Sequence, residues 1–164
     1  TLLSEFRSIV SSEVESHFGI VDKFIGDAVM AVFGVPVPQS GDEKNGINCA
    51  VSILEQVEVW NEKRKDIDLP EVHVTIGVHS GEVFAGAVGT ENRMEFTVLG
   101  DTVNIAARLQ EAAKKTETGL VVSLNVLDKA GHLSINHQSW KALNENAIRG
   151  RMGSISLYGI VRAT

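Results

Sequence analysis

The spacing of apolar residues along the chain predicts short strands alternating with amphipathic helices. Apolar positions recur every three or four residues in segments that predict helices over residues 1–19, 42–66, 102–115 and 124–130. Runs rich in valine, isoleucine and phenylalanine predict strands at 20–25, 28–33, 72–78, 83–88, 93–99, 120–122 and, as an edge or terminal strand, 154–161. Residues 80–82 are expected to form the turn of a hairpin between the strands at 72–78 and 83–88. Asp42, Asp101 and Ser123 stand where helix caps are expected.

The order of these elements predicts an α+β fold. A helix, two strands, a helix and two strands are followed by a small αβ C-terminal extension, and antiparallel hairpins with helices on one face form a sandwich. A strand before the first helix would complete a ferredoxin-like βαββαβ core. Because no repeat, low-complexity segment or boundary is visible, residues 1–164 are expected to form one domain.

Composition excludes some classes of protein without choosing a function. The chain is 43% hydrophobic and 22% charged, as globular proteins are, and no apolar run approaches the roughly 20 residues of a membrane span. The net charge of −6 gives no reason to expect nucleic-acid binding, so a phosphate ligand would need local cations. The single cysteine, Cys49, lies in an apolar helical pattern and is expected to be an inert core thiol. A reducing, cytoplasmic setting fits these features.

The segment 20–34 carries the first candidate chemistry. Two apolar runs joined at Gly26-Asp27 predict a buried hairpin with an aspartate at its tip and Lys23 four residues earlier. One interpretation is a turn residue beside a solvated charge. The other is a metal-binding carboxylate beside a lysine that contacts substrate. The segment alone leaves both open.

Three other clusters have polar groups that suit chemistry. Asn104 and Arg108 are four residues apart on a predicted helix and therefore share a face, either as an exposed polar pair or as a site. Thr97 is either an ordinary strand residue or a hydroxyl placed for a ligand. Arg149-Gly150-Arg151 is a basic turn, which is either solvated or able to meet phosphate.

Three motifs together resemble the catalytic domain of class III adenylyl/guanylyl cyclases. They are K-F-I-G-D-A-V-M-A-V-F-G, G-V-H-S-G-E-V-F-A-G-A-V-G and F-T-V-L-G-D-T-V-N-I-A-A-R-L, in the order and approximate spacing of that family. One such motif would be weak, whereas three in order over nearly the whole chain are highly specific. The resemblance implies a ferredoxin-like core and a head-to-tail homodimer with active sites at the interface. One subunit would supply two aspartates for two divalent metal ions, Mg²⁺ or Mn²⁺.

The resemblance also implies roles for single residues. Asp27 matches the second metal aspartate, and Lys23 matches the lysine that contacts the purine. Thr97 falls on the second purine-contacting position, where many members have aspartate and a largely bacterial subgroup has threonine. Arg149 falls near a phosphate-binding lysine of the family, in a looser alignment of the C-terminal segment.

The Asn/Arg pair and the base-contacting pair point to one reaction. Asn104 matches the residue that orients the ribose, and Arg108 matches the arginine that stabilises the transition state. Guanylyl members typically carry glutamate and cysteine at the purine positions, so Lys23 and Thr97 imply ATP as substrate. The implied reaction is conversion of ATP to 3′,5′-cyclic AMP and pyrophosphate for intracellular signalling, under sensor or regulatory domains of a longer parent chain.

The chain departs from the family at one place. The first metal aspartate lies in an F-x-D-[IL]-x-G-[FY] pattern before the first helix, and this sequence contains no such pattern. Asp22 is next to Lys23, so strand alternation predicts that the two side chains face opposite sides. We therefore expect the second carboxylate upstream of Thr1, and little activity from residues 1–164 alone. The alternative is a non-catalytic cyclase-like module that dimerises or binds nucleotide; a diguanylate cyclase would need a G-G-[DE]-E-F hairpin, which is absent.

Overall fold

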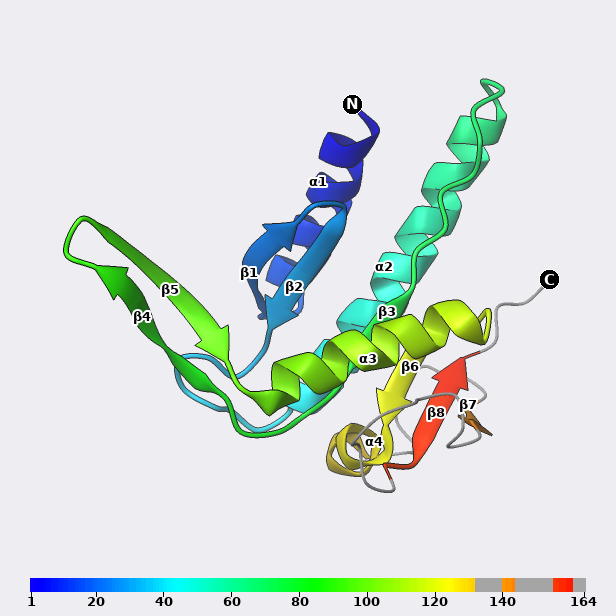
Figure 1. Ribbon diagram of the computed structural model, residues 1–164. Coiled ribbons are helices and arrows are strands. Elements are labelled where there is room, and N and C mark those ends of the chain that lie inside the picture. The colour runs from blue at the N-terminus through cyan, green and yellow to red at the C-terminus, as the bar shows by residue number, and fades with distance from the viewer. Residues whose placement is uncertain (132–139, 144–154, 161–164) are drawn as a thin grey trace.

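The computed structural model describes residues 1–131, 140–143 and 155–160, and it confirms the predicted α+β class (Figure 1). The elements are α1 (Leu2–Ser16), β1 (Ile20–Ile25), β2 (Ala28–Val32), α2 (Asp42–Lys65), β3 (Ile76–Val78), β4 (Phe84–Thr90), β5 (Arg93–Leu99), α3 (Asp101–Lys115), β6 (Leu120–Ser123), α4 (Leu124–Ala130), β7 (Trp140–Leu143) and β8 (Leu157–Ile160). None of the helices in these ranges is both long enough and apolar enough to cross a bilayer.

The largest sheet among the described residues has four strands in the order β3-β6-β8-β7. Strand β3 runs parallel to β6, and β8 pairs antiparallel with both β6 and β7. The last strand was predicted to be an edge or terminal strand. It is the final strand in chain order among the described residues, but it lies inside the sheet and not at its edge. Apolar alternation indicates burial of a strand, but it carries no information about which neighbours the strand will have.

Helices cover both faces of this sheet, so the predicted one-sided arrangement is wrong. Leu120 and Val122 of β6 pack among buried residues of α2 and α4. Val121, which points the other way, packs with Leu109 of α3 and with Leu157 of β8. All four residues of β6 are buried. The run Leu-Val-Val is apolar at every position because both of its faces meet a helix.

A second core joins α1 and α2 to the β1–β2 hairpin. Val10 and Val14 of α1 pack with Cys49, Ile53 and Val57 of α2, and apolar side chains of the hairpin complete the cluster. Burial, together with the negative charge of Glu13, raises the pKa of the Cys49 thiol to about 12. The thiol is therefore protonated at neutral pH and behaves as the expected core residue.

The second hairpin joins different strands from those predicted, because the strand at 83–88 pairs with the strand that follows it and not with the one before it. Strands β4 and β5 pair from Phe84–Leu99 to Thr90–Arg93, so the turn falls at residues 91–92 and the segment 79–83 is a connection. The predicted strand at 72–78 is a strand only at Ile76–Val78. Upstream of it, the Asn61 side chain occupies both polar backbone groups of Val72, at 2.8 and 2.9 Å. Figure 1 shows the β4–β5 hairpin projecting away from the rest of the molecule.

The helix starts also differ from the predictions. Gly41 and Gly100 occupy the cap positions of α2 and α3, and the expected caps Asp42 and Asp101 are the first residues of these helices. Ser123 does precede α4, but its side chain makes no capping bond. Acidic residues in a first turn still suit the positive end of the helix dipole.

Helix α3 lies directly on β3 because residue 77 is glycine. A Cβ at Gly77 would collide with the backbone of Ala106 and Gln110. Glycine removes this obstacle, so the helix and the strand approach more closely than any other residue would allow. The position of α3, and of the polar residues that it carries, therefore depends on Gly77.

We predict that Gly77→Ala destabilises the fold, because the added methyl group must push α3 off the sheet. Overpacking of this kind typically costs about 1–3 kcal/mol. Urea unfolding followed by circular dichroism measures the free energy of unfolding. Gly46→Ala in α2 is the matched control, since a Cβ there would meet the Phe33 ring at an ordinary 3.5 Å. The control should gain up to about 1 kcal/mol from helix propensity, and equal effects of the two changes would contradict the prediction.

Candidate functional site

The β1–β2 hairpin carries Asp27 at its tip, as predicted. Strand pairing ends at Ile25–Ala28, so Gly26 and Asp27 form a two-residue turn, with Gly26 at φ 62°. Glycine at the first position of such a turn accepts this left-handed geometry without strain. The hairpin is not buried as expected, because its strands are half-buried and its tip, including Asp27, is exposed.

Arg7 of α1 holds this tip in place. Its Nη2 atom donates a 2.8 Å hydrogen bond to the carbonyl oxygen of Gly26. Its guanidinium group also lies over the Phe24 ring, 4.6 Å from the centroid. A hydrogen bond and a cation–π contact from one side chain restrict the motion of the turn. Asp27 is therefore presented to solvent from a supported position.

Lys23 and Thr97 meet although 74 residues separate them in the chain. The Lys23 Nζ atom donates a 2.6 Å hydrogen bond to Thr97 Oγ1. Lys23 belongs to β1 and Thr97 to β5, so the contact connects the two hairpins. It lies at a recess of about 320 Å³ lined by Asp22, Lys23, Glu95, Phe96 and Thr97.

Asp22 also faces this recess, which contradicts the prediction from strand alternation. The register of β1 shifts between Val21, opposite Ala31, and Lys23, opposite Met30. Asp22 is the additional residue of this β-bulge, and such a residue re-aims side chains of its strand. Its Oδ2 atom lies 3.4 Å from Lys23 Nζ and 3.3 Å from Thr97 Oγ1.

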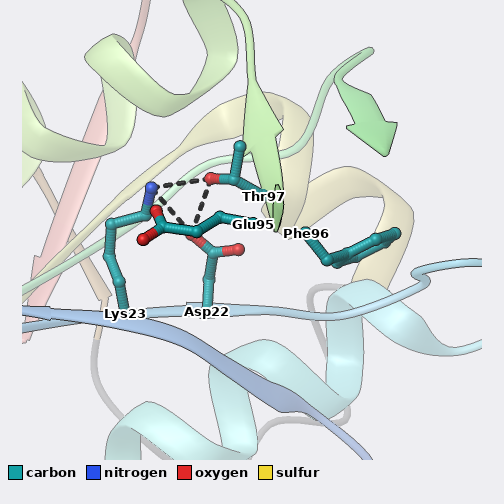
Figure 2. Close-up of a pocket in the computed structure, with 5 residues that line it drawn as sticks. All are labelled: Asp22, Lys23, Glu95, Phe96 and Thr97. Atoms are coloured by element: carbon teal, nitrogen blue, oxygen red, sulfur yellow. Dashed lines mark hydrogen bonds and ion pairs between the residues drawn. The ribbon is translucent and has the colours of Figure 1, made fainter. Parts of the chain in front are cut away.

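Figure 2 shows Asp22, Lys23 and Thr97 pointing toward one another, whereas Phe96 points away. The Asp22 side chain is only 3% exposed. Sequence reasoning missed this residue because a bulge leaves no mark in an apolar alternation pattern. The one available signal was an acidic residue directly beside a lysine already selected as a candidate.

Asn104 and Arg108 share the solvent-facing side of α3. Both are exposed, whereas Leu109, Ala112 and Ala113 form the buried side of the helix. The predicted shared face is confirmed, and both interpretations of the pair, an exposed polar pair or a site, are compatible with this placement. Exposure also means that Arg108 incurs no burial penalty in a single copy of the chain.

Two features predicted from the sequence are not seen in the described residues: a phosphate contact by Arg149 and a complete set of metal ligands. Arg149 lies outside the described residues. Within the described ranges, no three or more His, Cys, Asp or Glu side chains are grouped so that they could hold a metal ion. Asp27 is thus a single exposed carboxylate that would fit one position around a divalent ion, because such ions prefer oxygen ligands.

The connection between β3 and β4 is held by its own polar contacts. His79 Nδ1 and Ser123 Oγ are 2.8 Å apart, and Ser80 Oγ donates to Glu43 Oε1 at 3.0 Å. Burial lowers the pKa of His79, Lys129 lowers it further, and Asp101 opposes the shift. His79 is therefore neutral at pH 7 and anchors the segment that leads into the projecting hairpin.

Comparison with known proteins matches almost the entire chain. A family model for the adenylate and guanylate cyclase catalytic domain covers residues 1–160. Adenylate cyclase 1 of Rhizobium meliloti is 30% identical over 165 aligned residues, which are 99% of this chain and 24% of that protein. This chain thus spans about a quarter of the length of the curated relatives it matches first.

Two solved structures have a similar fold. The adenylyl cyclase CyaB from P. aeruginosa superposes with a TM-score of 0.84 at 22% identity, covering 99% of this chain and 82% of that one. The guanylyl cyclase Cya2 superposes with a TM-score of 0.76 at 23% identity, covering 96% and 79% of the two chains. These similarities confirm the predicted fold, and they include proteins named for either purine.

We predict that folding stability falls as the pH is lowered below about 6.5, the usual pKa of histidine. Because the pKa of His79 is lowered in the folded protein, the unfolded chain takes up the proton first. This contribution to stability is complete above the unfolded pKa and is lost as the pH falls toward the folded one. Urea unfolding between pH 5 and 8 measures the effect.

The variant His79→Gln keeps a polar side chain but cannot titrate, so its stability should depend less on pH over the same range. His17→Gln at the end of α1 is the control for general histidine effects. Equal pH slopes for the wild type and His79→Gln would show that His79 does not make this contribution.

Proposed function

Because this chain belongs to the adenylate and guanylate cyclase catalytic domain family, we propose that it converts ATP to 3′,5′-cyclic AMP and pyrophosphate. The observation that carries the choice of ATP is the 2.6 Å contact between Lys23 and Thr97. An ammonium group can donate to adenine N1, and a threonine hydroxyl can accept from the exocyclic amine. The name of the Rhizobium meliloti relative, Adenylate cyclase 1, also supports this choice.

The proposed reaction joins the ribose 3′-oxygen to the α-phosphorus and breaks the bond from that phosphorus to the bridging oxygen of pyrophosphate. The hydroxyl proton leaves as the new bond forms, and the bond pair stays with the departing oxygen. There is little covalent work for protein groups, so positioning and charge stabilisation supply the rate. Asn104 would orient the ribose, and the Arg108 guanidinium would meet charge that grows on the phosphoryl oxygens.

Two divalent metal ions, Mg²⁺ or Mn²⁺, would activate the attacking oxygen and stabilise the leaving oxygens. Asp27 would supply one carboxylate to this pair from the hairpin tip. Arg149 would contact the phosphates, a role taken from the sequence resemblance alone. The second metal carboxylate would come from the parent protein, because the three motifs supply only Asp27.

The site would be completed by a second copy of the chain in a head-to-tail homodimer. Asp27 sits at the turn held by Arg7 near the start of α1, whereas α3, which carries Arg108, follows the base of the β4–β5 hairpin (Figure 1). The projecting hairpin exposes Phe84 by 61%, Met94 by 60% and Phe96 by 56%. Exposed apolar side chains on an extended arm favour contact with another subunit.

A longer parent protein would supply the domains that regulate cyclase activity. Since this chain spans 24% of its Rhizobium meliloti relative, the remaining length of such proteins leaves room for sensor or regulatory domains. We propose that residues 1–164 are the catalytic domain of a protein of this kind and that its cyclic product serves intracellular signalling.

The full-length parent protein should form cyclic AMP from ATP with Mg²⁺ or Mn²⁺, and Arg108→Ala should lower turnover far more than it weakens substrate binding. Losing one preorganised charge-stabilising donor typically costs about 10²–10³ in kcat. Chromatographic measurement of cyclic product over a range of ATP and GTP concentrations separates kcat from KM for each nucleotide.

Lys114→Ala removes another exposed cation from α3 and is the matched control, expected to leave kcat unchanged. A loss confined to KM would assign Arg108 to substrate binding only. Nucleotide binding without a cyclic product would instead support the non-catalytic module.

Mixing inactive Asp27→Ala with inactive Arg108→Ala subunits should restore activity, because each heterodimer holds one site with both native residues. Random pairing would give about a quarter of wild-type activity, since half of the dimers are mixed and each has one working site. Cyclic AMP production after subunit exchange measures the recovery. Mixing Arg108→Ala with an Asp27→Ala/Arg108→Ala double variant is the control and must stay inactive. If the first mixture also stays inactive despite exchange, the shared site is wrong.

A further inference from the structure

The base-contacting pair has a third, buried partner in Asp22. We propose that Asp22 is a positioning residue for purine selection: it accepts the Thr97 hydroxyl proton and so fixes that hydroxyl as an acceptor toward the base. The inference rests on the proposed function, because it concerns how the same recess distinguishes a 6-amino purine from a 6-oxo purine. It adds a residue that neither the sequence motifs nor strand alternation had selected.

The three polar groups form a closed triangle. Thr97 Oγ1 accepts from Lys23 Nζ at 2.6 Å and donates to Asp22 Oδ2 at 3.3 Å. Asp22 Oδ2 also pairs with Lys23 Nζ at 3.4 Å. The Asp22 side chain is 3% exposed and Thr97 is 7% exposed, whereas the Lys23 side chain is 40% exposed. All three residues line the recess, but the lysine is the accessible charged group and the carboxylate is almost fully enclosed.

The donor and acceptor capacities of these groups decide which way the threonine proton points. A carboxylate only accepts, an ammonium group only donates, and a hydroxyl has one proton and two lone pairs. Lys23 therefore occupies one lone pair of Thr97 Oγ1. Within the described part of the chain, the Thr97 hydroxyl proton is donated to Asp22. One lone pair of Thr97 remains for a ligand in the recess.

This arrangement favours adenine over guanine. The exocyclic amine of adenine donates, so it can satisfy the free lone pair of Thr97. The O6 atom of guanine accepts and would face a second acceptor, a mismatch that a partly buried site penalises. Without Asp22, the hydroxyl could rotate and donate to O6. The Thr97 hydroxyl alone is compatible with either purine, so Asp22 adds a preference at the 6-position to the one that Lys23 gives through N1.

Two other roles for Asp22 make different predictions. If Asp22 only balanced the charge of Lys23, its loss would change catalytic efficiency with ATP and GTP alike. If it were a metal ligand, its loss would abolish turnover of both nucleotides. Fixing the hydroxyl proton is the role that changes the ratio between them and that requires Thr97.

The test measures kcat/KM for ATP and for GTP with the full-length parent protein and its variants. Asp22→Leu keeps the branched shape but removes the acceptor, and it should lower the ATP-to-GTP ratio about tenfold or more, as expected for relief of one buried polar mismatch. Asp22→Asn retains an oxygen that can take the same proton, so its ratio should stay within about threefold of the wild type. Glu58→Leu on the exposed side of α2 is the control for carboxylate loss.

A double-mutant cycle connects the effect to the hydroxyl. In a Thr97→Val background, adding Asp22→Leu should leave the ATP-to-GTP ratio unchanged, because no rotatable hydroxyl remains. An unchanged ratio in Asp22→Leu, or an equal drop with and without Thr97, would overturn the inference. If Asp22→Leu does not fold, Asp22→Ala is measured in its place with the same expectations.

The two proposals fail in different ways. A wild-type protein that forms no cyclic product from either nucleotide overturns the proposed function. Calorimetric affinities for ATP and GTP then decide the inference, with the same expected change of ratio in Asp22→Leu. A wild-type protein that binds neither nucleotide overturns both proposals. Cyclic AMP synthesis with no change of ratio overturns this inference alone.

Discussion

Burial of β6 on both faces is the constraint on which the rest of the structure depends. Leu120 and Val122 require α2 and α4 on one side, and Val121 requires α3 on the other. In the four-stranded sheet β3 and β8 flank β6, so the pairing and the burial of this strand are both satisfied. Removing apolar area from water is the main favourable term in folding. A strand that is apolar on both faces therefore requires a packed element on each side. Gly77 lets α3 approach this sheet closely enough to complete the second layer.

The candidate site forms where two hairpins outside this sheet meet. The β1–β2 hairpin is held by its core with α1 and α2 and by the contact of Arg7 with Gly26. The β4–β5 hairpin is placed by the segment that His79 anchors on Ser123. The contact between Lys23 and Thr97 is therefore a consequence of separate packing arrangements, each of which must be correct for the recess to exist.

Polar groups at the site fall into two kinds that suit different steps. Lys23, Thr97 and Asp22 are already paired with one another, so a base bound there as proposed would meet donors and acceptors in fixed orientation. Such preorganisation lowers the entropic cost of binding. Asn104, Arg108 and Asp27 are exposed on other elements. Their exposure leaves them accessible to a second subunit, which is the arrangement that we propose for the shared site.

The sequence by itself determined the α+β class, the β1–β2 hairpin and the candidates Lys23, Asp27, Thr97, Asn104 and Arg108, because periodicity and turn residues report local burial and local geometry. It placed the turn of the second hairpin one connection too early. Only the tertiary structure decided that β3 pairs with β6, that β8 lies inside the sheet and that helices cover both faces. Strand partners depend on contacts distant in sequence, which a local pattern does not encode. The inward orientation of Asp22 also required the structure, since a single bulge reverses the alternation that the sequence predicts.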